Sequence, residues 1–335
     1  MKKHIIAAAV AAAVTVPAMA QNVTIYGVLE AGLENNKSTA GASTAIMDSH
    51  EFTSNRLGFR GEEDLGGGMK AFFRLESGTN ITDGVSGAST NSTFFNRGAE
   101  VGLSGGFGRL SLGKQDHNGI EGNEISLVGN RGLFGAASVT TTPEVEMSGR
   151  ASDLNDTISY TTPSFNGISV NVMYSPNDNG GASYAGSTAT THAGVTSFQA
   201  AGSISGVSFK IGGGTLKEQA GTKINVRGGS LSYNFGALTA AIAVQQQDNP
   251  AGTNDASESI ISAAIPLGNG LTLGMAYASL DIDNITTGDY KSTMLMVKKD
   301  LSKRTALTGM YRSADPGASG LQAAKTTGVY VTHSF

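Results

Sequence analysis

The chain has 335 residues, of which 39% are hydrophobic and 15% charged, and it contains 46 glycines but no cysteine or tryptophan. The lack of cysteine excludes a disulfide scaffold and thiol chemistry, and a formal net charge of −4 gives no support for nucleic-acid binding. Beyond the N-terminal region, no apolar run approaches the ~18 residues that a transmembrane helix needs.

The first 20 residues have the pattern of a secretory signal peptide. Lys2 and Lys3 precede an apolar run over residues 5–16, and the small-residue site Ala18-Met19-Ala20 follows. The apolar run is too short to span a bilayer as a helix. We expect cleavage after this site, so that residues 21–335 are exported as a single domain. That domain keeps 21 basic and 27 acidic residues, because two of the 23 Lys and Arg lie in the signal.

Short turn signals recur along the exported domain at a regular pitch. Seven short segments rich in Gly, Asn, Asp, Ser and Pro alternate with eight longer polar stretches. Fifteen connections predict sixteen strands, and short turns at one end with long loops at the other are typical of an outer-membrane β-barrel. The short turns are 62–68, 104–108, 163–167, 203–206, 234–237, 266–270 and 300–303, and the long stretches are 35–50, 78–92, 115–155, 175–192, 216–222, 246–257, 281–290 and 313–325.

The predicted strands place apolar and charged residues on opposite faces. Phe73 and Leu75, for example, oppose Arg74 and Glu76. In a barrel the charged face lines a wet lumen, whereas in a soluble sandwich the same alternation would put the apolar face in the core. Sixteen strands of about ten residues with no helical pattern between them favour one large barrel. The basic residues expected on the lumen side are Arg56, Arg74, Arg109, Lys210 and Arg227.

The last ten residues alternate out to a terminal aromatic, Phe335, with no polar tail. A period of two with one semi-apolar face predicts a half-buried strand that closes the sheet. This segment resembles the C-terminal strand of bacterial outer-membrane β-barrels, which typically ends in Phe. Phe335 is therefore the candidate for barrel closure and for an assembly signal.

Four segments together resemble the hallmark strands of the general trimeric porins of β-proteobacteria. They are residues 23–32 (VTIYGVLEAG), 55–71 (NRLGFRGEEDLGGGMKA), 95–104 (FNRGAEVGLS) and 155–165 (NDTISYTTPSF). The resemblance implies an all-β transmembrane antiparallel barrel of about 16 strands that forms a water-filled homotrimeric pore. It also implies contact with outer-membrane lipid and assembly by periplasmic chaperones and the barrel-assembly machinery.

Residues 115–155 form the longest predicted connection. The resemblance implies that this third long loop folds inward and narrows the lumen. Long structureless connections in compact proteins are usually functional or disordered. The loop contains apolar residues such as Ile120, Leu127 and Phe134, which favours an ordered inward fold over a disordered surface loop.

A pore needs a constriction whose width sets a size limit and whose charges set ion preference. In the family, basic residues of the barrel wall face acidic groups of the inward loop. An alternative for Arg56 and Arg74 is that they only solvate the lumen away from the narrowest point. The wall candidates are Arg56, Arg97 and Arg150 by motif match and Arg74 by alternation, and the loop candidates are Glu121, Glu124, Glu144 and Glu146.

Two charged residues conflict under strict alternation. Arg97 shares parity with Val101 and Leu103, whereas Glu100 has the opposite parity and stands where the family usually has an aromatic residue. If Arg97 faces the lumen, Glu100 faces lipid or a subunit contact, unless a β-bulge intervenes. The ion preference is also open: the wall arginines favour anions, and the acid-rich loop favours cations. We favour anions because the barrel wall is rigid.

No enzymatic site is predicted. The histidines of the exported domain lie in predicted long loops, except for His333 in the final strand, and none has a neighbouring pattern that suggests a Ser-His pair. We expect no cofactor and no resident metal, although the acids of residues 115–155 could bind Ca²⁺ loosely. The alternative to a porin is an outer-membrane barrel that acts mainly as an adhesin or surface receptor through its long loops.

Overall fold

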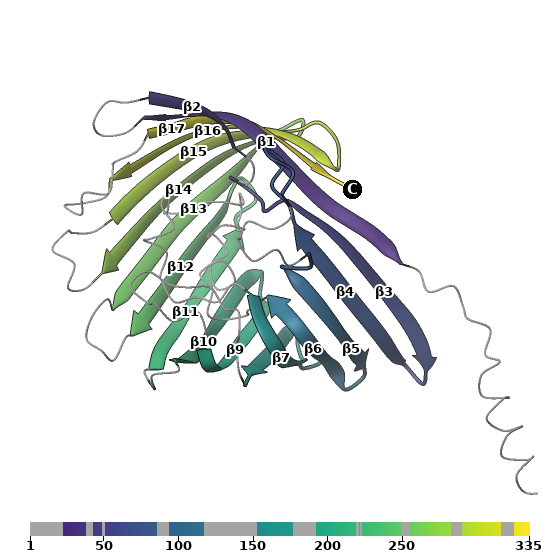
Figure 1. Cartoon of the computed structure of the whole chain (residues 1–335). Helices are drawn as coiled ribbons and strands as arrows, with labels where there is room; N and C mark the ends of the chain where they lie inside the picture. Colours follow the sequence, from purple (N-terminus) through teal and green to yellow (C-terminus); the bar gives the residue numbers. More distant parts are fainter. Residues whose placement is uncertain are drawn as a thin grey trace, which may run out of the picture.

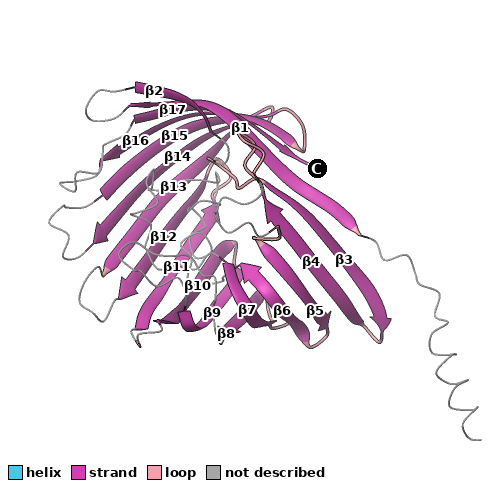
Figure 2. Cartoon of the chain, in the orientation of Figure 1, coloured by secondary structure: helices cyan, strands magenta, loops and turns pink. Residues whose placement is uncertain are grey.

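A computed structural model describes residues 23–37, 43–48, 51–85, 94–116, 153–176, 192–218, 221, 223–248, 255–282, 290–315 and 325–335. Over these ranges the chain forms one antiparallel sheet that closes into a barrel (Figure 1), with turns and loops at the two ends (Figure 2). No helix within the described ranges is long and apolar enough to cross a lipid bilayer.

Strands follow one another around the barrel almost wholly in sequence order. The first nine are β1 (Thr24–Lys37), β2 (Ser43–Asp48), β3 (Arg56–Gly66), β4 (Met69–Gly78), β5 (Gly98–Gly105), β6 (Gly108–Asp116), β7 (Asp153–Thr161), β8 (Ile168–Ser175) and β9 (His192–Ile204). The others are β10 (Val207–Glu218), β11 (Lys223–Asn234), β12 (Thr239–Asp248), β13 (Ala256–Gly268), β14 (Leu271–Ile282), β15 (Tyr290–Asp300), β16 (Thr305–Asp315) and β17 (Lys325–Ser334).

The sheet has 17 strands but the barrel has sixteen strand positions, because β2 and β3 together occupy one position beside β1. β3 pairs with the first half of β1, from Thr24 to Val28, and β2 pairs with the second half, from Gly32 to Lys37. On its other edge, β1 pairs with β17 and closes the sheet. The predicted sixteen-stranded barrel is confirmed, with its second strand interrupted.

The C-terminal residue completes this closure. The backbone N–H of Phe335 donates to the carbonyl of Gly27, and the N–H of Gly27 donates to the carbonyl of Phe335, both at 3.1 Å. Gly27 is required here, since an added Cβ would lie 2.4 Å from Cζ of the Phe335 ring. The last residue of the chain therefore reaches the first strand, as the alternating C-terminal segment predicts.

All seven predicted short turns join consecutive strands, and the strand ends that the longer connections join lie at the other end of the barrel. Short turns in barrels of this topology are periplasmic and long loops extracellular. The stretch 35–50 was expected to be one long loop, and this is wrong in part. β1 continues to Lys37, and β2 occupies Ser43–Asp48, because the two strands pair with each other over these residues.

Side chains alternate between the outer and inner surfaces. Outward residues include Val101, Leu112 and Val329, which are 57%, 44% and 54% exposed and form part of a lipid-facing apolar surface. The inner surface is not uniformly charged, contrary to expectation. From β12 to β17 it carries a buried apolar cluster that we call the apolar inner wall. Its members are Phe52, Ala241, Ala256, Ile260, Ala276, Ala278, Leu280, Met294, Met296, Met310, Ala314 and Tyr330.

Candidate pore lining

The inner faces of β3 to β6, together with the residue that precedes β5, carry a group of arginines, which we call the arginine wall: Arg56, Arg60, Arg74, Arg97 and Arg109. Cross-strand register places Arg60 opposite Arg74 and Arg74 opposite Glu100. Ser104 of β5 then pairs with Arg109 of β6 on the same face. The β3–β6 segment lies across the barrel from β12–β14 (Figure 1), so charged and apolar walls face each other.

Glu100 is the centre of one ion-pair network. Its carboxylate lies 2.8 Å from Arg74 Nε and 3.7 Å from an Arg109 terminal nitrogen, and it accepts a hydrogen bond from the Ser111 hydroxyl. The Arg109 guanidinium also lies over the Phe72 ring, 3.4 Å from its centroid. Glu100 is largely buried and has little access to bulk water, so its negative charge is stabilised by Arg74 and Arg109.

Glu76 is the centre of a second network. It accepts from Arg97 Nε at 2.8 Å and from the Tyr26 hydroxyl at 2.8 Å, and Arg74 lies 3.9 Å away. The Arg97 backbone N–H also donates to the Glu76 carbonyl at 3.1 Å. Arg74 therefore lies between two buried carboxylates and links the networks.

This arrangement resolves the conflict between Arg97 and Glu100. β5 begins at Gly98, so Arg97 precedes the strand and is not constrained by its alternation. Glu100 faces the lumen with Arg74, and β4 and β5 pair without a register shift. Both charges thus line the lumen, and no bulge is needed.

Arg56 is the first residue of β3, and it follows the segment that lies inside the barrel. Its terminal nitrogen Nη1 donates to the Ser54 carbonyl at 3.0 Å and lies 3.5 Å from the Thr53 hydroxyl. The preceding residues fold against the inner wall: the Phe52 N–H donates to Glu30 at 2.6 Å, and the Phe52 ring packs edge-on against Tyr330 with centroids 5.1 Å apart. Residues 51–55, which precede β3, therefore form an ordered lumenal segment.

Glu51 anchors this segment through an ion pair with Arg312 of β16. Glu34, Asp48 and Glu51 have carboxylate oxygens within 4.8 Å of one another. Burial, with a smaller contribution from the neighbouring acids, raises the pKa of Glu51 to about 7, although Arg312 opposes the shift. A proton at Glu51 relieves the repulsion within the acidic group.

The structure brings three of the four predicted wall residues together, since Arg56, Arg74 and Arg97 lie on one side of the lumen. Arg150 and the four loop candidates Glu121, Glu124, Glu144 and Glu146 lie outside the described residues, as does the signal segment 1–20.

The prediction that Arg227 faces the lumen is wrong. Ile224 and Val226 face inward and are buried with Leu216, so Arg227 faces outward, where it pairs with Asp248 at 2.5 Å. The upper part of β11 lies near the extracellular end, where the outer surface is polar and the inner surface is packed. The alternation correctly separated the two faces of β11, but the assumption that the charged face is the lumenal one is wrong for this part of the strand.

Several pore-lining residues were missed by sequence reasoning. Arg60 has the same parity as Arg56 and could have been found from that signal alone. Glu76 was assigned to the charged face, but its pairing with Arg97 could not be read from the sequence. Arg312 and Glu51 are 261 residues apart, and nothing in the local pattern joins them.

Comparison with known proteins agrees with this architecture. The model of the Gram-negative porin family matches residues 7–318. The major outer membrane protein P.IB of Neisseria meningitidis serogroup B is 30% identical over 328 residues, covering 91% of each chain, and that of Neisseria lactamica is 31% identical over 329 residues with the same coverage.

Solved structures of porins share the fold. An anion-selective porin from Comamonas acidovorans superposes with a TM-score of 0.75 at 24% identity, covering 94% of this chain and 100% of that one. OmpF of Salmonella typhi, in complex with daunomycin, gives a TM-score of 0.71 at 15% identity, covering 94% and 98%.

A closed barrel with a charged inner wall and an apolar outer surface defines a transmembrane pore. The chain belongs to the Gram-negative porin family and forms a channel in the outer membrane. Family membership favours this role over the adhesin alternative and over an enzyme.

Proposed function

We propose that the channel allows passive diffusion of small hydrophilic solutes and ions, with a weak preference for anions set at the arginine wall. The observation that carries this proposal is the charge balance on the inner faces of β3–β6. Five arginines and Lys70 share this surface with four inward carboxylates, those of Glu62, Asp64, Glu76 and Glu100. An excess of fixed positive charge raises the local concentration of anions in a narrow pore.

The inward fold of residues 115–155 is part of this proposal. The apolar inner wall of β12–β17 offers a surface on which the apolar side chains of this loop can pack. Acidic residues of the loop would then face the arginine wall across the lumen. Glu121 and Glu124 are the main candidates for this role, and Glu144 and Glu146 are secondary candidates.

The proposed assembly is a homotrimer that reaches the outer membrane after removal of residues 1–20. Closed, symmetric homo-oligomers are common among soluble proteins, and a solved porin of similar fold, OmpT of Vibrio cholerae, has a trimer form. Phe335 is proposed to act as the signal for the barrel-assembly machinery, with periplasmic chaperones delivering the unfolded chain. A heat-sensitive oligomer on gels run without boiling is expected, and a species that always migrates as a monomer would contradict the trimer.

The ion preference is tested in a planar bilayer with purified, detergent-refolded protein. Stepwise conductance that rises with salt concentration is expected from a water-filled pore. Under a KCl gradient, the sign of the reversal potential reports whether anions or cations carry more current. A cation-selective reversal potential would reject the anion preference while leaving the pore itself intact.

A further inference from the structure

Arg109 differs from Arg74 and Arg97 in how its guanidinium is held. Arg74 and Arg97 each donate from Nε to a buried carboxylate at 2.8 Å. The Arg109 guanidinium forms no hydrogen bond with any of the described residues, and its distance to the Glu100 carboxylate is 3.7 Å. The Arg109 side chain is also 42% exposed. A contact other than a hydrogen bond therefore fixes this charge on the lumen wall.

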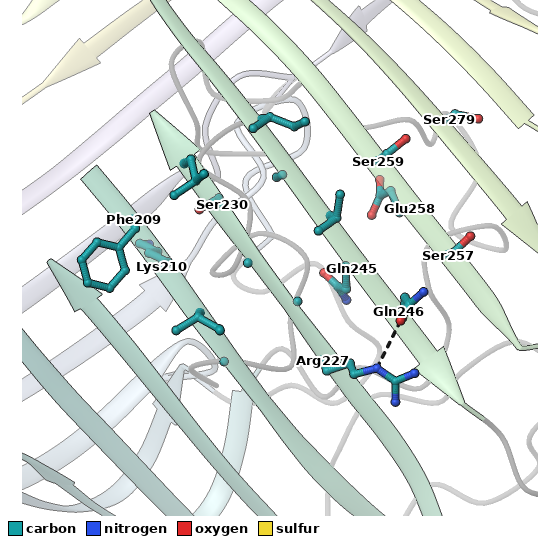
Figure 3. A pocket seen from close by; sticks show the side chains of 18 of the residues that line it. Phe209, Lys210, Arg227, Ser230, Gln245, Gln246, Ser257, Glu258, Ser259 and Ser279 are labelled. Atoms are coloured by element: carbon teal, nitrogen blue, oxygen red, sulfur yellow. Dashed lines mark hydrogen bonds between the residues drawn. The ribbon is translucent and has the colours of Figure 1, made fainter. Parts of the chain in front are cut away.

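Arg227 on the outer surface shows how polar partners hold an exposed arginine. Figure 3, a close-up of the hollow over β10–β14, shows its Nε donating to Gln246, at 3.1 Å, and a terminal nitrogen donates to Asp248 at 2.5 Å. Arg109 has an aromatic ring in place of such partners. Its guanidinium carbon lies 3.4 Å from the centroid of the Phe72 ring, which makes this a close cation–π contact.

The sequence of β5 leaves room for this ring. Two of its inward positions, Gly98 and Gly102, have no side chain. Phe72 of β4 pairs in register with Gly102, and an added Cβ at Gly102 would collide with Cζ of the Phe72 ring. The ring therefore lies across β5 toward β6, the strand from which Arg109 extends.

Phe72 gives the guanidinium a fixed, flat surface. The residue is only 4% exposed, so the ring has little room to move. Arginine stacks well on aromatic faces, and a partly exposed cation–π contact favours the held position by about two- to fivefold. Without the ring, the long side chain of Arg109 would spend more time in the water of the lumen opening, where salt screens its charge.

We propose that Phe72 is a positioning residue for ion selectivity, which holds the positive charge of Arg109 against the lumen wall beside Glu100. Arg109 follows the short turn 104–108 directly, so this charge lies toward the periplasmic end of the arginine wall. A charge fixed there raises the local concentration of anions at that end of the lumen. The inference rests on the proposed anion preference and adds the residue that keeps one of its charges in place.

A double-mutant cycle on the full folded protein tests this proposal. Reversal potentials under a KCl gradient give the anion-to-cation permeability ratio for Phe72→Leu, Arg109→Gln and the combination of both. Arg109→Gln is expected to lower the ratio about twofold, and Phe72→Leu to lower it by a smaller factor. In the Arg109→Gln background, Phe72→Leu should have no further effect, because no charge is left to position. Phe72→Tyr keeps the aromatic face and should retain the wild-type ratio.

Phe73→Leu is the matched control, because Phe73 faces the lipid side of β4 in register with Val101 and should not affect the ratio. If Phe72→Leu does not fold, Phe72→Met removes the ring at similar volume and takes its place. The proposal is overturned if the ratio rises in Phe72→Leu, falls equally in Phe73→Leu, or falls as much with Arg109→Gln present as without it. A cation-selective wild type would reject only the anion preference, since the cycle would still show whether Phe72 acts through Arg109.

Discussion

Arg97 and Glu76 are joined twice, by a side-chain ion pair with Arg97 Nε 2.8 Å from Glu76 Oε1 and by a backbone hydrogen bond of 3.1 Å. The pair fixes the entry of the chain into β5 to the inner face of β4. The side chains are only 6% and 14% exposed for Glu76 and Arg97, so the pair is shielded from water. It holds one positive charge of the arginine wall at a defined place in the lumen.

Glu76→Gln should therefore change both stability and ion preference. Removing the carboxylate removes the buried ion pair with Arg97 and is expected to cost about 3 kcal/mol in the free energy of unfolding. The loss of one negative charge should also make the reversal potential more anion-selective. Urea unfolding followed by circular dichroism measures the first effect, and a bilayer recording measures the second.

The control for this variant is Glu62→Gln. Glu62 faces the same lumen, and among the described residues its ion-pair partner is the exposed Lys70, at 2.9 Å. Its removal is expected to cost less than about 1 kcal/mol, because exposed ion pairs contribute little. Equal destabilisation by the two variants would contradict the buried network.

Arg74 and Arg227 should differ in their effect on ion selectivity. Arg74→Gln removes a positive charge from the lumen and is expected to lower the preference for anions. Arg227→Gln removes a charge from the outer surface, so the reversal potential should stay at its wild-type value. A shift of similar size in both variants would show that Arg227 faces the conducting path after all.

These two residues also show what alternation can and cannot predict. A period of two separates the faces of each strand, and it placed Arg74 correctly. It does not say which face contacts lipid. Near the extracellular end of β11 the inner face is apolar and the outer face is charged, so the assumption that charged residues face the lumen is wrong for Arg227. The apolar inner wall was missed for the same reason, because Met294 and Met310 look like lipid-facing residues in sequence.

The turns were predictable because their chemistry is local. Gly66, Gly67 and Gly68 all have positive φ, of 80°, 62° and 78°, and this run of glycines marked the β3–β4 turn directly. The break between β2 and β3 could not be predicted in this way. It depends on Glu51 and Phe52 reaching Arg312 and Tyr330 at the other end of the chain. Contacts between residues this distant in sequence have no local signal.

Barrel closure should fail when Gly27 is enlarged. Gly27→Val would push a side chain into the Phe335 ring and the Arg56 carbonyl, which would lie only 2.6 Å from an added Cβ. Overpacking of this kind is expected to cost about 2 kcal/mol. The folded fraction, measured by the mobility difference between heated and unheated samples on a gel, should fall.

Gly309→Ala is the matched control for closure. Gly309 lies on the outer face of β16, and an added Cβ there would meet no atom within 4 Å. This variant should fold as well as the wild type. If both glycine variants fold equally well, the fit between Gly27 and Phe335 does not limit closure.

The stability of the barrel should decrease as pH rises through the titration of Glu51. Its pKa is raised from 4.5 to about 7 in the folded protein. Between these values the folded state holds one more proton than the unfolded state, so the free energy of unfolding falls as pH increases. A shift of this size corresponds to on the order of 3 kcal/mol. The contribution is fully present below about pH 4.5 and lost above about pH 7.

Glu51→Gln should flatten this part of the pH profile, because the amide does not titrate. Thermal unfolding followed by circular dichroism between pH 4 and 8 compares the slopes. Glu62→Gln, which changes an exposed carboxyl, should keep the wild-type slope. A Glu51→Gln profile as steep as the wild type would place the titrating group elsewhere.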